Sequence, residues 1–96
     1  SNNIQCPADE QQPLLLNPYP NPADDEVHLD FILPNDGDVT LTIYYSDGKQ
    51  MIQVFAGEAP AGLNRLTFSA RTFAKGFYTC QLTYGGQVLH KHFLRK

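Results

Sequence analysis

The stretch Asn17-Pro18-Tyr19-Pro20-Asn21-Pro22-Ala23 holds three of the chain's seven prolines. Each proline fixes its own φ, lacks a backbone donor and drives the residue before it toward an extended conformation. Neither a helix nor a central strand can pass through such a stretch. The residues before it are polar and unpatterned, whereas those after it alternate between apolar and polar. The stretch is therefore predicted to separate a linker from a folded domain.

The length of 96 residues predicts one domain. Residues 1–13 are predicted to be a polar linker, because Ile4 is the only large aliphatic residue before Pro13 and the segment cannot offset its ordering entropy. Residues 14–96 then form the folded domain. No signal peptide is visible, so we expect a fragment from the C-terminal end of a longer protein.

The net charge of −3 argues against a nucleic-acid partner, which a basic patch would indicate. No apolar run approaches the roughly 20 residues of a membrane-spanning helix. Together these features favour a protein that binds neither nucleic acid nor the interior of a membrane.

Alternating apolar residues begin at Glu26 and continue to the end of the chain, the period-2 pattern of half-buried strands. Strands are predicted over residues 26–33, 39–45, 51–55, 64–69, 77–84 and 88–95. Residues 14–16 are either a first short strand or a local hydrophobic anchor, and residues 57–62 are predicted to be a longer connection. The expected core comprises Val27, Leu29, Phe31, Val39, Leu41, Ile43, Ile52, Val54, Leu66, Phe68, Tyr78 and Leu82, with Phe73 closing its edge.

Turn signals separate these strands, and no amphipathic helix is visible. The pattern predicts an all-β fold, an antiparallel β-sandwich of about seven strands, with an unclosed barrel as the alternative. Gly48, Gly62 and Gly76 are interpreted as turn glycines that allow positive φ.

Candidate chemical sites are few. His90 and His92 share one face of a strand and His28 is a possible third ligand, but a closed zinc site needs four. Asp36-Gly37-Asp38 lacks the longer ligand series of a calcium loop and is better interpreted as a turn. We therefore expect no metal and no cofactor.

Catalytic motifs are also missing, because the sequence has no G-x-S-x-G, phosphate-binding glycine loop or H-E-x-x-H. The acidic residues Asp24, Asp25 and Glu26 are adjacent and alternate faces on a strand, which suits a solvated strand start. Cys6 and Cys80 fit no zinc spacing; they either pair or leave Cys80 as a small buried apolar residue. We do not expect an enzyme.

Several motifs occur in a fixed order along the chain. They are Tyr19-Pro20-Asn21-Pro22-Ala23, Val39…Ile43-Tyr44 leading to Asp47-Gly48, Pro60-Ala61-Gly62, Phe73-Ala74-Lys75-Gly76-Phe77-Tyr78, and a last strand with Lys91 and a basic end. In order and spacing they resemble the C-terminal sorting domain of the type IX (Por) secretion system of Bacteroidetes. The resemblance covers roughly Leu14 to Lys96, although His90-Lys91-His92 stands where the family often has adjacent lysines, and Tyr44-Tyr45 replaces its usual Tyr-Asp pair.

This resemblance implies an Ig-like sandwich that directs its parent protein from the periplasm across the outer membrane. The implied partners are the type IX secretion machinery and a sortase-like surface protease, which in most members removes the domain and joins the cargo to an anionic lipopolysaccharide. The final location would be the outer-membrane surface or the medium. The residues that it suggests for recognition are Pro20, Asn21, Pro22, Lys91, Phe93, Arg95 and Lys96. Residues 20–22 are explained equally well as a stiff turn.

The last strand is expected to be an edge strand whose terminal charges a receptor reads while adding a strand of its own. Deleting Arg95 and Lys96 is expected to change stability little, because both are predicted to be exposed charges with almost no buried area. Two other functions remain open. One is an adhesive or carbohydrate-binding module using Tyr44, Tyr45, Phe77 and Tyr84; the other is a passive spacer.

Overall fold

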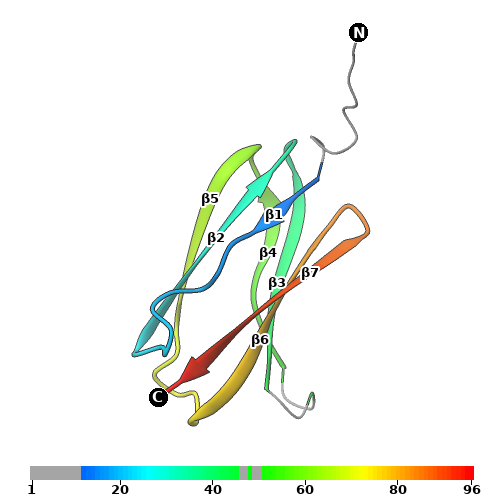
Figure 1. The fold of residues 1–96 in the computed structure, drawn as a ribbon. Coiled ribbons are helices and arrows are strands. Elements are labelled where there is room, and N and C mark those ends of the chain that lie inside the picture. Colours follow the sequence, from blue (N-terminus) through cyan, green and yellow to red (C-terminus); the bar gives the residue numbers. More distant parts are fainter. Residues whose placement is uncertain (1–11, 46–47, 49–50) are drawn as a thin grey trace, which may run out of the picture.

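The computed structural model describes residues 12–45, 48 and 51–96, so nearly all of the predicted linker lies outside the described residues. The described part contains seven strands and no helix (Figure 1). Their bounds are β1 (Leu14–Leu15), β2 (Glu26–Leu33), β3 (Gly37–Tyr45), β4 (Met51–Ala59), β5 (Gly62–Ser69), β6 (Gly76–Tyr84) and β7 (Gln87–Arg95).

The strands form two antiparallel sheets that pack face to face. One sheet has the order β1-β2-β5 and the other β4-β3-β6-β7. The predicted Ig-like sandwich is confirmed, and the short strand at Leu14 pairs with Ile32 of β2. Strand β7 lies at the edge of the four-stranded sheet, as the sequence predicted.

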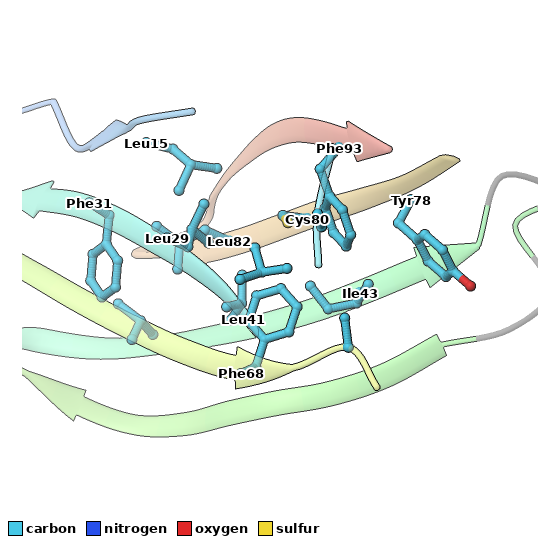
Figure 2. Close-up of a cluster of buried hydrophobic side chains, with 14 of the residues drawn as sticks. Leu15, Leu29, Phe31, Leu41, Ile43, Phe68, Tyr78, Cys80, Leu82 and Phe93 are labelled. Atoms are coloured by element: carbon cyan, nitrogen blue, oxygen red, sulfur yellow. The ribbon is translucent and has the colours of Figure 1, made fainter. Parts of the chain in front are cut away.

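The core lies between the sheets and is built from alternate residues of the central strands (Figure 2). Period-2 alternation sends every second side chain inward, and on β2 these are Val27, Leu29, Phe31 and Leu33, each at most 1% exposed. The predicted core residues of β3, β6 and the end of β5 are also buried. Phe73 packs against the core as expected.

Strand β4 departs from the prediction. Ile52, expected inside, is 47% exposed, and Val54 is only half-buried, as is Leu66 of β5. The register between β3 and β4 shifts beyond Leu41, which faces Phe55 while the next residue of β3 faces Gln53. Val54 is thus an extra residue in a β-bulge, and the bulge interrupts the simple alternation along an edge strand.

The predicted connection at residues 57–62 is also wrong. Strand β4 continues to Ala59 and β5 starts at Gly62, so only Pro60 and Ala61 connect them. Backbone pairing of Gly57 with Val39 extends the ladder through residues without an alternating pattern.

The β6–β7 hairpin sets where the chain's last residues lie. Gly85 (φ 57°) and Gly86 (φ 82°) form its two-residue loop, the type I′ geometry that matches strand twist. From Tyr84 opposite Gln87, the register runs without interruption to Gly76 opposite Arg95. Arg95 is thereby placed at the end of the sandwich where β2 begins.

Candidate functional site

The proline-rich stretch carries the chain from one sheet to the other. Tyr19 pairs with His28 of β2, with backbone N···O distances of 3.0 and 2.8 Å, and Ala23 forms a parallel bridge with Arg95 of β7. The three residues between, Pro20, Asn21 and Pro22, make the crossing, and the peptide bonds before both prolines are cis. In Figure 1 this segment lies beside the end of β7.

Tyr19 is anchored on the outer face of the three-stranded sheet. Its ring lies 5.2 Å from that of His28, and the Arg65 guanidinium lies 5.7 Å from the ring centroid. Arg65 Nε also donates to Asp30 Oδ1 at 2.9 Å, and this hydrogen bond holds the pKa of the Asp30 carboxyl below its ordinary value. The side of the crossing before Pro20 is therefore fixed.

The side after Pro20 is fixed by the end of β7. Ala23 N donates to Leu94 O at 2.6 Å, and Lys96 N donates to Ala23 O at 3.3 Å. Leu94 N donates to Asn21 Oδ1 at 3.0 Å. The crossing segment thus covers the last outward-facing backbone groups of β7.

The Arg95 guanidinium binds the backbone carbonyls of Ala23 and Ala70, which we call the Arg95 socket. Its side chain is 14% exposed, with Nε donating to Ala70 O at 2.8 Å and Nη1 to Ala23 O at 3.3 Å. Nη2 lies 3.6 Å from Asp25 Oδ1, and the backbone carbonyl of Asp25 accepts from Ala70 N at 2.7 Å. The expectation that Arg95 is an exposed charge is wrong. We call Asn21, Ala23, Asp25, Ala70 and Arg95 the terminal clamp.

Lys96 lies outside this socket. Its side chain is 59% exposed, and its Nζ is 2.9 Å from Asp24 Oδ1, which is 65% exposed. Asp24 and Asp25, just before β2, therefore offset the charges of Arg95 and Lys96 at the end of β7, about seventy residues away in sequence.

Phe93 belongs to the core, with 1% exposure. Its ring stacks on that of Tyr78 at 5.4 Å and lies 6.0 Å from that of Phe68. Tyr78 donates its hydroxyl to Ala74 O at 2.7 Å, as expected of a buried tyrosine, and desolvation raises its pKa. Phe93 therefore supports the fold from beneath the clamp and presents no surface to a partner.

Lys91 shares the inward side of β7 with Phe93 and is half-buried at the edge of the sandwich. It faces Cys80 in the register, a free thiol with 0% exposure whose pKa burial raises to about 12. The ion pairs found within the described residues do not include Lys91. An inward-facing charge on an edge strand discourages pairing with other chains.

The histidines do not converge on a metal site. His90 Nε2 lies 2.9 Å from Gln81 Oε1 and His92 Nδ1 lies 3.0 Å from Thr79 Oγ1 on the four-stranded sheet. His28 belongs to the other sheet, where its Nδ1 lies 2.8 Å from Thr67 Oγ1. Among the described residues no three His, Cys, Asp or Glu side chains gather where they could hold a metal.

The four aromatic residues considered for carbohydrate binding do not share a face. Tyr45 and Tyr84 take the inward positions of their strands and pack against the core, and their hydroxyls donate to backbone carbonyls. Tyr44 and Phe77 take outward positions, and of the four only Phe77, at 62%, is a largely exposed ring. The described surface thus offers no aromatic platform from this set.

The three predicted turn glycines all have positive φ: 75° at Gly48, 98° at Gly62 and 142° at Gly76. At Gly76 an added Cβ would also lie 3.3 Å from the Tyr45 hydroxyl.

Within the described residues no helix is long and apolar enough to cross a membrane.

The structure brings together the two ends of the predicted recognition set. Asn21 and Arg95 meet in the terminal clamp, with Pro20 and Pro22 flanking it and Lys96 beside it. Sequence reasoning missed Ala23 and Ala70, which have 0% exposure and supply the clamp's carbonyls. The one signal in the sequence is their small size at the ends of segments without alternation, which is compatible with close packing of another side chain against their backbone.

The comparisons with known proteins identify a family. Residues 17–96 match the family model described as "Secretion system C-terminal sorting domain". No match was found among curated proteins or among solved structures. The matched range begins at the proline-rich stretch and includes every residue of the terminal clamp.

Proposed function

This chain belongs to the family of C-terminal sorting domains of the type IX secretion system, and we propose that the secretion machinery reads it at the open edge of β7. Members of this family are non-catalytic signal domains that mark proteins for secretion across the outer membrane. The family match over residues 17–96 is the observation that carries the sorting function. The contact surface and the partners are proposed from the geometry of β7.

The outward-facing backbone of β7 supports a strand-addition surface. Leu94 directs its N–H and C=O away from β6, so the alternation of an antiparallel ladder gives His92, His90 and Val88 the same direction. Leu94 is covered by the crossing segment, and no bond within the described residues covers the backbone of the other three. This row matches the needs of an extended partner segment, which binds through main-chain hydrogen bonds.

Lys91 gives this edge a chemical preference. It lies between His90 and His92 of the open row, and it has no ion-pair partner among the described residues. A partner segment that places a carboxylate beside Lys91 would satisfy its charge, whereas an apolar or basic segment would not. We therefore propose that the component of the secretion machinery that binds here presents an acidic extended segment.

Charge reversal tests this contact. Lys91→Glu should reduce delivery of the protein to the surface of a type IX-secreting bacterium, because it repels an acidic partner. Lys75→Glu makes the same change in net charge at an exposed residue between β5 and β6 and should leave delivery unchanged. Thermal unfolding of both variants reports whether each is folded. Equal delivery of the two folded variants would refute the proposed role of Lys91.

We further propose that a sortase-like surface protease separates the domain from its parent protein within or next to residues 1–13. Proteases need an extended and accessible segment, and the polar composition of these residues suits one. The parent would then reside on the outer-membrane surface or in the medium. Mass spectrometry of fragments from secreting cells would locate the new N-terminus. A terminus within residues 26–95 would contradict this proposal.

A further inference from the structure

We propose that Asn21 is a positioning residue that docks the last residues of β7 for recognition, and that no partner contacts it directly. This inference rests on the proposed function, because recognition is what the docking serves. An exposed asparagine between two prolines suggests a contact residue on sequence grounds. The geometry assigns its side-chain acceptor to the chain's own backbone, through the 3.0 Å hydrogen bond from Leu94 N.

This hydrogen bond pairs a backbone amide at the edge of β7 that does not bond to β6. Among the residues of β7 whose backbone groups point away from β6, Leu94 is the one whose carbonyl and amide are both hydrogen-bonded to the crossing segment. Ala23 N supplies the donor for the carbonyl, whereas the Ala23 carbonyl accepts from Lys96 N and Arg95 Nη1 and not from the Leu94 amide. The acceptor for the Leu94 amide therefore comes from a side chain.

Asn21 also controls the two residues after Leu94. The backbone of Ala23 accepts from both Lys96 N and Arg95 Nη1, so the crossing segment must stay in register for Arg95 to fill its socket. Pro20 and Pro22 limit the backbone conformations of Asn21, and this restricts the positions that its side-chain oxygen can take. Losing that acceptor loosens the chain's last three residues together while the buried core remains intact.

Three variants of the full chain, fused behind a folded reporter with an N-terminal export signal, separate positioning from direct contact. Asn21→Ala removes the acceptor, whereas Asn21→Asp keeps a carboxylate oxygen that accepts from the Leu94 amide. Asn64→Ala is the matched control: its side chain donates to Pro60 O at 2.9 Å and Gly62 O at 3.2 Å, at the opposite end of the sandwich. The readouts are hydrogen exchange of the Leu94 amide by NMR, thermal unfolding, and the fraction of reporter on the cell surface.

We expect Asn21→Ala to stay folded, to exchange the Leu94 amide about five- to tenfold faster than the unaltered chain, and to lose most surface delivery. Asn21→Asp should protect the amide and restore delivery, and Asn64→Ala should leave both unchanged. Normal delivery by Asn21→Ala with an unprotected amide would overturn the proposal. So would failed delivery by Asn21→Asp with a protected amide, since a partner would then read the amide group itself.

Failure of the proposed function gives a different result. In that case the unaltered fusion itself does not reach the surface. Exchange at Leu94 then decides the docking role alone, and an Asn21→Ala chain with unchanged protection would overturn it.

Discussion

Replacing Arg95 by alanine should destabilise the domain by about 2–3 kcal/mol, far more than the loss of an exposed charge. The guanidinium donates to Ala70 O at 2.8 Å and to Ala23 O at 3.3 Å, and hydrogen bonds from a charged donor contribute about 1.5–3 kcal/mol each at most. The distance to Ala23 O is long, so we count that second bond at less than half of the first.

Two features keep the cost from rising further. Both carbonyls retain another donor after the substitution, Phe73 N for Ala70 O at 3.0 Å and Lys96 N for Ala23 O at 3.3 Å, so no buried acceptor is left unpaired. The ion pair with Asp25 contributes little, because that carboxylate is 69% exposed and solvent screens it. For a domain of this size the predicted loss corresponds to a fall in Tm of roughly 10–20 °C.

Urea unfolding of the purified chain measures this loss directly, with an unchanged m-value showing that only stability has changed. Lys96→Ala is the control, because its side chain is 59% exposed and its partner Asp24 is 65% exposed, which predicts a change within about 0.5 kcal/mol. Arg95→Lys should fall between the two, since one ammonium cannot reach both carbonyls and Asp25 in the same geometry. Equal stability of Arg95→Ala and Lys96→Ala would refute the socket.

Three further predictions concern the sandwich itself. Phe31→Ala should cost about 3–5 kcal/mol in unfolding experiments, because the ring is 1% exposed, and a loss below about 1 kcal/mol would contradict the core. In a Cys6→Ser background Cys80 should resist iodoacetamide at pH 8 until the domain unfolds, because its pKa is raised to about 12 and its thiol is covered; rapid labelling of the folded chain would disprove this. The pKa of Asp30 is lowered in the folded state, so its stabilising effect is present above about pH 4 and disappears as pH falls through the folded pKa. The stability difference between the unaltered chain and Asp30→Asn should therefore shrink in acid, and a difference that grows there would contradict the pairing with Arg65.

The alternation of apolar and polar residues predicted burial well on strands that have a neighbouring strand on both sides. On β2 and β3 each residue has a partner strand on at least one side and the opposing sheet beneath, so inward positions follow the period of two. On β4 the same pattern failed. Ile52 lies opposite the buried Ile43 but stays exposed on an edge strand, and the bulge at Val54 moves the next inward position to Phe55. Strand period is thus a weaker guide at the edge of a sheet.

The terminal clamp shows what pattern reasoning could not reach. The sequence indicates both Asn21 and Arg95, but their hydrogen bonds join segments more than seventy residues apart, and in each bond one partner is a backbone group. Backbone groups are the same at every residue, so no side-chain pattern marks Ala23 or Ala70 as acceptors. The sequence predicts an exposed charge at Arg95, whereas the structure buries its aliphatic stem and directs its guanidinium into the protein.

The most direct test of the central claim is surface delivery of a reporter that carries this chain at its C-terminus and an export signal at its N-terminus. The measurement compares a type IX-secreting bacterium with the same strain lacking its outer-membrane translocon, by protease shaving of intact cells. The account predicts surface reporter in the first strain and periplasmic reporter in the second, with the reporter alone remaining periplasmic in both. Equal distribution of the fusion in the two strains would contradict the assignment of this chain as a sorting signal.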